Sequence, residues 1–355
     1  MSFVKLPEDI SSESKEGDIL MEQYKELENC KLCAWECGVD RLAGEKGVCM
    51  MGLPAVASCQ LHSAPPQSYT VFTAGCNFRC LNCQNYDIAH YPAIKTPIRG
   101  RINPERIAQE GVNKIQSREG QLIGADRFFF SGGSPTVSLP WIEQVIEHAK
   151  KLDSSVKVNF DTNGFPSKES FQRILDFSDS ITFDIKAYHN ETHRALTGAP
   201  VEPVLQNVER MVKNKEKLWE FRILVIPTIV EQSEVQAIAE FLVSLDETIP
   251  VCFLAFRPNF CLDKHPGATK KLMIEAVDIA QNVGLINVKW AGFPNIYGTI
   301  LYPPAEFLEK FTYKQAAFAA YYAHQAGCKQ SHRNCGDCDN QQDCRVKVYS
   351  PYRRT

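Results

Sequence analysis

The sequence predicts an α/β fold whose mostly parallel sheet forms a partial, open barrel. Strand-like and helix-like segments alternate from residue 69 to residue 290, which is typical of parallel strands joined by crossover helices. Polar and Gly-rich residues follow the C-terminal ends of these strands, where parallel α/β barrels place their active sites. Six or seven such units are too few to close an eightfold barrel, so an open barrel is expected.

The elements follow one another in a regular order. Strands are expected at residues 69–73, 127–130, 157–160, 180–183, 220–226, 250–256 and 286–290. Helices are expected at residues 104–116, 140–151, 168–177, 203–215, 233–245 and 270–283. A long helix is expected over 305–325, ahead of a Cys-rich tail, and irregular, metal-tied chain is expected over 29–68.

These elements divide the chain into three parts. Residues 1–68 are interpreted as an N-terminal arm and a Cys-rich segment, and residues 69–295 as the partial barrel. Residues 296–355 are interpreted as a C-terminal helix and a Cys-rich, cluster-binding extension.

Composition limits the class of protein. The chain has 355 residues, of which 44% are hydrophobic, and a formal net charge of -3 without a long run of one sign. This balance gives no electrostatic reason to expect nucleic acid as a partner. The chain has no uninterrupted apolar run of ~18 residues for a membrane span. Its polar, acidic start lacks the basic and apolar regions of a signal peptide, so a cytoplasmic protein is expected.

Fourteen cysteines in a chain without a secretion signal favour metal or redox chemistry over disulfides. Eleven of them fall into three sets, and Cys59, Cys252 and Cys261 remain outside these sets. The first set is Cys30, Cys33, Cys37 and Cys49; the second is Cys76, Cys80 and Cys83; the third is Cys328, Cys335, Cys338 and Cys344. Cys252 lies in an apolar run, where core packing is the default interpretation.

The second set is the most informative feature of the chain. Cys76, Cys80 and Cys83 can hold three irons of a four-iron cluster, and no fourth Cys follows within the loop. One iron is then open to a ligand from outside the protein, which indicates a cluster that performs chemistry. A zinc site with a distant fourth ligand is the alternative.

Together with other segments, this loop resembles the radical S-adenosylmethionine (SAM) superfamily, most closely the pyruvate formate-lyase activating enzyme group and its uncharacterised archaeal and bacterial relatives. The resemblance extends over Cys83-Gln84-Asn85-Tyr86-Asp87, Asp184-Ile185-Lys186, Leu196-Thr197-Gly198 and Arg222-Ile223-Leu224-Val225-Ile226-Pro227. It implies a partial (β/α)6 barrel and a [4Fe-4S] cluster whose open iron is chelated by SAM. One electron then cleaves SAM to methionine and a 5′-deoxyadenosyl radical, which removes hydrogen from a substrate.

The resemblance also implies which residues contact SAM. Gly132 and Gly133 match the family's glycines near the SAM amino group, and Asp184 and Lys186 match its Asp-x-Lys pair. The remaining SAM-contact candidates are Ser134, Asn163 and Arg257. Ser134 stands in place of an acidic residue of the family, Arg257 in place of a His, and Asn82 in place of an aromatic residue that packs on adenine. The sequence assigns no catalytic residue.

The two flanking sets each supply four soft ligands. For the N-terminal set, tetrahedral zinc and a second Fe–S cluster are both compatible with the spacing. For the C-terminal set an auxiliary Fe–S cluster is favoured over zinc, because many radical SAM enzymes carry extra clusters in such extensions.

The resemblance to glycyl-radical activases favours a protein or peptide substrate. The expected reaction is hydrogen abstraction from a residue of that substrate, either to make a glycyl radical or to begin another modification. The electron donor is expected to be of ferredoxin or flavodoxin type. A cobalamin-dependent C-methyltransferase acting on a protein residue is an alternative, and a non-enzymatic iron–sulfur electron carrier or zinc scaffold is another.

Overall fold

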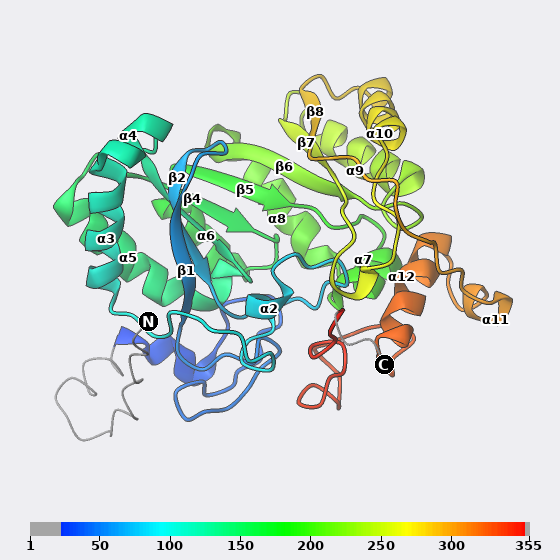
Figure 1. The fold of residues 1–355 in the computed structure, drawn as a ribbon, viewed down its shortest axis with the longest axis horizontal. Helices are drawn as coiled ribbons and strands as arrows, with labels where there is room; N and C mark the ends of the chain where they lie inside the picture. The colour runs from blue at the N-terminus through cyan, green and yellow to red at the C-terminus, as the bar shows by residue number, and fades with distance from the viewer. Residues whose placement is uncertain (1–22, 352–355) are drawn as a thin grey trace.

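The computed structural model describes residues 23–351. Its strands form a single eight-stranded sheet. Residues 1–22 of the expected N-terminal arm and residues 352–355 lie outside the described part. The strands are β1 (Val56–His62), β2 (Ser68–Thr73), β3 (Arg127–Gly132), β4 (Lys157–Thr162), β5 (Ser180–Asp184), β6 (Leu218–Val225), β7 (Val251–Ala255) and β8 (Val288–Ala291). They neighbour one another in chain order, and β1 and β8 are the two edges of an open sheet (Figure 1).

Helices connect successive parallel strands. The α-helices are α2 (Tyr86–Ala89), α3 (Pro104–Gln116), α4 (Arg118–Ile123), α5 (Leu139–Leu152), α6 (Lys168–Phe177), α7 (Asn190–Thr197), α8 (Glu202–Val212), α9 (Gln232–Leu245), α10 (Lys270–Val283), α11 (Ala305–Leu308) and α12 (Lys314–Gln325). From β2 to β8 all pairings are parallel. The segment from β2 to α10 therefore contains six strand-to-helix units, and the predicted open α/β barrel is confirmed.

The first strand, β1, was not expected, because residues 29–68 were predicted to be irregular. β1 pairs antiparallel with β2 over six residue pairs. Its C-terminal half is largely exposed, as suits an edge strand, so it lacks a continuous apolar run that would predict it. The Cys-rich N-terminal segment is thereby attached to the sheet beside the loop that follows β2.

The predicted long helix over 305–325 is wrong, since the chain forms two helices there. α11 ends at Leu308 and α12 begins at Lys314. Between them the amides of Thr312 and Tyr313 donate to the Glu191 carboxylate on α7, at 2.8 and 3.2 Å. The amides at the break between the two helices are therefore bound by a residue of α7, and a local sequence pattern cannot reveal such a contact.

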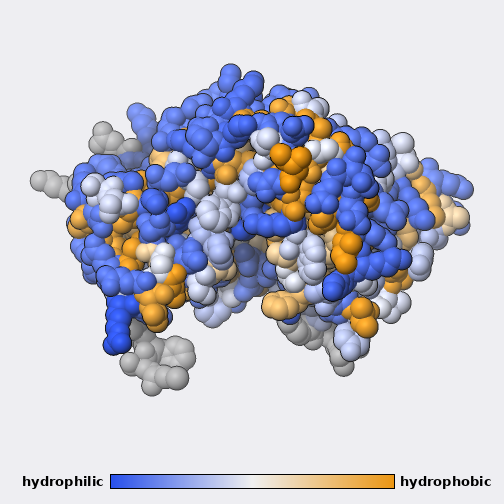
Figure 2. All heavy atoms as spheres, turned by 90° about the horizontal axis from the view of Figure 1, so that it is seen from above, coloured by the Kyte–Doolittle hydropathy of each residue, from blue (hydrophilic) through white to orange (hydrophobic). Residues whose placement is uncertain are grey.

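Aromatic side chains fill the space between the sheet and its helices. The largest are fully buried: Phe128, Phe130, Phe160, Phe183 and Phe221 are each at most 1% exposed. A face of the molecule seen from above is mainly hydrophilic, with separate hydrophobic patches (Figure 2). Within residues 23–351, none of the helices has the length and apolar character that a membrane crossing requires.

Gly111 shows how closely α3 approaches the sheet. A Cβ at this position would lie 2.1 Å from Cζ of Phe128 on β3 and 2.9 Å from a ring carbon of Tyr69 on β2. A helix interior normally favours Ala over Gly by about 1 kcal/mol. At this position steric overlap reverses that preference.

We therefore expect Gly111→Ala to lower the free energy of unfolding by about 1–3 kcal/mol, the usual cost of overpacking. Arg106→Ala, on the exposed face of the same helix, is the matched control and should change it by about 0.5 kcal/mol or less. Chemical denaturation measures both variants. A stabilised Gly111→Ala variant would show that α3 does not pack this tightly.

Candidate active site

The thiols of Cys76, Cys80 and Cys83 come together in the loop that follows β2. Cys76 is buried and the other two are half-buried. Burial raises the pKa of all three thiols, that of Cys80 to about 12. The charges of Cys80 and Cys76 raise the pKa of Cys83 further, so the three sulfurs share one small region. The charge of Lys186 lowers the pKa of all three thiols and so favours the thiolate form that binds metal.

A buried arginine shapes this loop. The Arg79 guanidinium, 4% exposed, donates to the carbonyl oxygens of Cys76 at 2.7 Å and Phe78 at 2.8 Å, and also to that of Val48. The Arg79 amide donates to the carbonyl of Thr197 at 2.7 Å. The loop is therefore fixed on one side to the N-terminal segment and on the other to the end of α7.

Asn77 connects the loop to two further parts of the chain. The indole of Trp35 donates to its carbonyl at 2.8 Å, and the amide of Asn163 donates to its side-chain oxygen at 2.7 Å. The structure thus brings the candidate Asn163 directly against the three-Cys loop. The side-chain nitrogen of Asn77 and the side-chain oxygen of Asn82 are buried without a hydrogen-bond partner, which leaves polar atoms free for a ligand.

The two glycines after β3 are required by close backbone approach. A Cβ on Gly133 would lie 2.0 Å from the carbonyl oxygen of Gly75, and one on Gly132 would lie 2.3 Å from that of Thr73. The amides of Gly133 and Ser134 donate to these same carbonyls at 2.9 Å. The end of β3 is therefore joined to the three-Cys loop, and the buried hydroxyl of Ser134 is left without a partner.

A group of alternating charges lies at the carboxyl ends of β4 and β5 and on the part of β6 beside them. Lys186 donates to Asp184 at 2.6 Å, and Ser131 donates to Asp161 at 2.6 Å. Burial and the charge of Asp184 raise the pKa of Asp161 to about 6, although Arg222 and Lys186 act against this rise. Asp161 and Arg222 were not among the predicted site residues. The signal that could have found Asp161 is its place at a strand end, beside Asn163.

Arg257 is the candidate that stands apart. It is exposed after β7 and lines a pocket with residues 293–297. Within the described part of the chain, no hydrogen bond or ion pair joins it to the three-Cys loop or to the strand-end charges. Its contact with SAM stays a prediction.

Comparison with known proteins identifies one domain in this chain. Residues 70–242 match the model of the Radical SAM superfamily. Residues 70–242 are therefore recognised as a radical SAM domain. It is 29% identical over 234 residues to the pyruvate formate-lyase-activating enzyme of Staphylococcus aureus, an alignment that covers 64% of this chain and 88% of that enzyme.

Solved structures of lower identity were also matched. A domain of pyruvate-formate lyase-activating enzyme from Bacteroides vulgatus is 20% identical, with a TM-score of 0.38, and covers 46% of this chain and 98% of that one. A radical SAM methyltransferase from Sphaerobacter thermophilus is 12% identical, with a TM-score of 0.47, and covers 66% of this chain and 69% of that one.

The radical SAM family implies a [4Fe-4S] cluster and SAM, and the residues of the loop fit this pair. Three thiols share a protected region, a lysine stabilises their thiolate form, and unpartnered polar atoms lie on the loop. Among residues 23–351, no three His, Cys, Asp or Glu side chains are grouped so as to hold a single metal ion. Such a group is what one ion requires, whereas the ligands of a four-iron cluster each bind a different iron.

The thiols of the N-terminal set also lie close to one another. Burial raises the pKa of Cys33, and the charges of Cys49, Cys37 and Cys30 raise it further. The buried guanidinium of Arg41 lies 3.6 Å from the Cys30 sulfur. The charge of Cys49 also raises the pKa of Cys76, so this set lies next to the three-Cys loop.

The C-terminal set lies on the other side of that loop. The amide of Cys335 donates to the carbonyl of Gly198 at 2.8 Å, directly after α7. Burial raises the pKa of Cys335, and the charges of Cys344 and Cys328 raise it further. Cys338 lies in a turn between the exposed Asp337 and Asp339. The auxiliary Fe–S cluster at the C-terminal set, and zinc or an Fe–S cluster at the N-terminal set, stay predictions.

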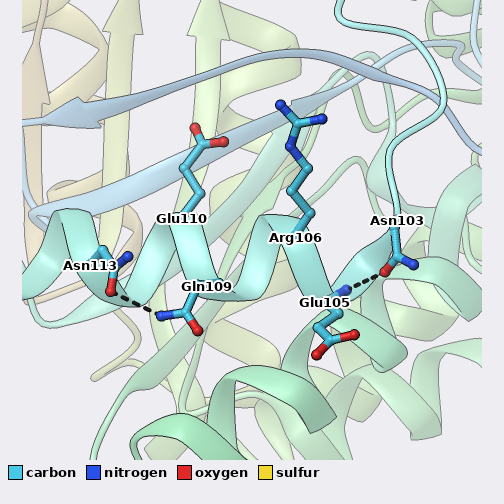
Figure 3. Close-up of a pocket in the computed structure, with 6 residues that line it drawn as sticks. All are labelled: Asn103, Glu105, Arg106, Gln109, Glu110 and Asn113. Atoms are coloured by element: carbon cyan, nitrogen blue, oxygen red, sulfur yellow. Dashed lines mark hydrogen bonds between the residues drawn. The ribbon is translucent and has the colours of Figure 1, made fainter.

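A pocket on α3 has no part in this chemistry. It is lined by Asn103, Glu105, Arg106, Gln109, Glu110 and Asn113 (Figure 3). The Asn103 side chain caps the helix by accepting from the Glu105 amide, and Gln109 donates to Asn113 at 3.0 Å (Figure 3). These polar groups already serve the helix, and none is a thiol.

The raised pKa of Asp161 has a consequence for stability. Its pKa is about 6 in the folded protein and about 3.9 when unfolded, so the folded state binds the proton more tightly. The free energy of unfolding should therefore fall as pH rises through this interval, and it should level off above pH 7. Asp161→Asn should remove this decline.

Denaturation at several values between pH 5 and pH 7.5 measures the effect. Asp153→Asn is the matched control, because hydrogen bonds from Ser155 lower the pKa of this exposed carboxyl and it stays ionised throughout. That variant should keep the wild-type decline. The same decline in Asp161→Asn would show that another group causes it.

Proposed function

We propose that this chain cleaves SAM reductively and uses the resulting radical to abstract hydrogen from a residue of a protein or peptide substrate. The outcome on the substrate is either a glycyl radical or the start of another modification. The observation that carries the proposal is the meeting of three thiols with the Asp184–Lys186 pair at the carboxyl edge of the sheet. We also propose that the reaction takes place in the cytoplasm.

Each residue has a place in the proposed site. Cys76, Cys80 and Cys83 would hold three irons of the cluster, and the cluster would supply one electron to bound SAM. Asp184 and Lys186 present opposite charges 2.6 Å apart, which suit the amino and carboxylate groups of the methionine part. The backbone of Gly132 and Gly133 and the free hydroxyl of Ser134 border the same space.

The proposed reaction uses one electron and one substrate hydrogen atom for each SAM. One electron from a donor of ferredoxin or flavodoxin type would enter, and the bond between the SAM sulfur and C5′ would break. Methionine would leave, and the 5′-deoxyadenosyl group would take one hydrogen atom from the substrate, which gives 5′-deoxyadenosine and leaves the unpaired electron on the substrate. The residues around the site serve to orient SAM and to exclude water.

Two observations support a polypeptide substrate. The Staphylococcus aureus relative is by its name the activating enzyme of pyruvate formate-lyase, which is itself a protein. The segment after β8 exposes large apolar and aromatic side chains near Arg257: Phe293, Ile296 and Tyr297 are 77%, 71% and 79% exposed. Exposed side chains of this kind suit contact with another chain.

Formation of 5′-deoxyadenosine tests the proposal. With dithionite as reductant, the anaerobically prepared protein should convert SAM to 5′-deoxyadenosine, and a variant with Cys76, Cys80 and Cys83 replaced by Ala should form none above background. Cys252→Ala is the matched control, since this buried cysteine on β7 lies outside all three sets. It should keep the wild-type rate.

Other results would assign a different function. SAM cleavage that survives in the triple variant would refute the central role of the loop. The absence of cleavage in the wild type would favour an iron–sulfur electron carrier or a zinc scaffold. Stoichiometric cobalt with a corrinoid absorption band would assign the cobalamin-dependent C-methyltransferase instead.

The role of Lys186 can be tested separately. Removal of a charged hydrogen-bond donor costs about 1.5–3 kcal/mol, so Lys186→Met should weaken SAM binding by roughly 10- to 150-fold. Lys289→Met is the control, because Lys289 on β8 pairs with Glu220 and lies outside the site. Equilibrium dialysis with labelled SAM measures both, and equal affinities in the two variants would contradict the assignment.

A further inference from the structure

Cys261 belongs to none of the three cysteine sets, yet it lies beside the three-Cys loop. It is 5% exposed, in a short 3-10 helix, η4 (Phe260–Leu262), that follows β7. Its amide donates to the carbonyl of Leu81 at 3.0 Å, between Cys80 and Cys83. One backbone hydrogen bond therefore separates Cys261 from the candidate radical SAM loop.

The C-terminal tail closes over the same place. The Arg333 guanidinium donates to the carbonyl of Arg79 at 2.7 Å and to that of Ala195 at 2.7 Å. The Tyr349 ring packs edge-on against Phe260, with centroids 5.7 Å apart, and its hydroxyl lies 3.4 Å from Asp263. Tail residues thus contact η4 and the loop at once.

Thiols of the C-terminal tail lie near Cys261. Burial raises the pKa of Cys261, and the charges of Cys344 and Cys328 raise it further. The charges of Cys344 and Cys328 also raise the pKa of Cys335. The backbone agrees with this grouping. A Cβ on Gly327 would lie 2.8 Å from Cβ of Arg345, so the chain at Cys328 runs beside the chain at Cys344. A Cβ on Gly198 would lie 2.3 Å from the Cys335 sulfur, and the Leu81 amide donates to the carbonyl of nearby Leu196 at 3.0 Å. Cys261, Cys328, Cys335 and Cys344 therefore surround one region. Cys338 lies in its solvent-flanked turn, where its carbonyl accepts from Gln341.

Three buried cations surround this region. Arg79, Arg333 and Lys347 are 4%, 1% and 2% exposed. In the described residues their hydrogen bonds go to backbone carbonyls, and none of them forms an ion pair with a carboxylate. The Nε atom of Arg333 is buried without any partner.

Buried cations without a counter-charge are costly. Four metal-bound thiolates form an anionic centre that would balance them. Arg333 and Arg79 both lower the pKa of Cys335, and Arg333 lowers that of Cys261, so these cations lie close enough to act on the thiols.

We propose that Cys261, Cys328, Cys335 and Cys344 are the four ligands of an auxiliary iron–sulfur cluster, and that Cys338 is not a ligand. An iron–sulfur cluster rather than zinc is proposed because one of the ligands is joined by a hydrogen bond to the redox-active loop. The proposal revises the ligand set expected from spacing alone. It goes beyond the proposed function and does not depend on SAM cleavage.

Metal content tests the ligand set without reference to activity. Full-length protein is reconstituted anaerobically with iron and sulfide, and iron, sulfide and zinc are measured per chain. Cys261→Ser and Cys344→Ser should each lose about four irons and four sulfides relative to the wild type. Cys338→Ser should retain them, as should the matched control Cys252→Ser, a buried cysteine on β7 that belongs to none of the sets.

Three outcomes would overturn the proposal: iron loss in Cys338→Ser, full iron in Cys261→Ser, or loss of zinc in place of iron. Circular dichroism of each variant checks that the fold is retained, and iron loss in Cys338→Ser would still overturn the proposal if Cys261→Ser does not fold. The variant with Cys76, Cys80 and Cys83 replaced by Ala should keep the auxiliary irons. Failure of SAM cleavage and failure of the auxiliary site are therefore distinguishable.

Discussion

The buried guanidinium of Arg79 joins the parts of the molecule that carry its chemistry. Its hydrogen bonds run to the carbonyls of Cys76 and Phe78 within the three-Cys loop and to Val48 in the N-terminal Cys-rich segment. Its own carbonyl accepts from Arg333 of the tail. A hydrogen bond to a charged group contributes about 1.5–3 kcal/mol, and a buried cation is costly if its partners are removed. In Figure 1 the N-terminal segment, the loop around α2 and the tail lie along one edge of the molecule, as these bonds require.

The parallel sheet supplies the second constraint. Because β3, β4, β5 and β6 all end at the same edge, residues far apart in the chain meet there without any local signal that pairs them. Gly132 and Gly133 let β3 approach the loop so closely that no side chain would fit. The Asp184–Lys186 pair then lies within electrostatic reach of the thiols, because Lys186 shifts the pKa of each of them. The positions of charge and thiol both follow from the ends of strands.

Local patterns predicted what is local. The strand and helix alternation, the open barrel and the cysteine sets could be read from the sequence, since each depends on short spacing. β1 was missed because an edge strand with an exposed end has little apolar pattern, and the break between α11 and α12 was missed because its partner, Glu191, lies on α7. Asp161 and Cys261 were missed for the same reason. Their significance comes from neighbours that only the fold brings together, as with Cys261 and Leu81.

The central claim is that SAM binds directly at the three-Cys loop. Electron paramagnetic resonance of the dithionite-reduced, anaerobically reconstituted protein, recorded with and without saturating SAM, tests it most directly. A ligand on the open iron changes the electronic environment of that cluster alone. The account predicts that SAM alters the spectrum of the wild type and leaves unchanged the spectrum of the variant with Cys76, Cys80 and Cys83 replaced by Ala. A wild-type spectrum that is identical with and without SAM would contradict it.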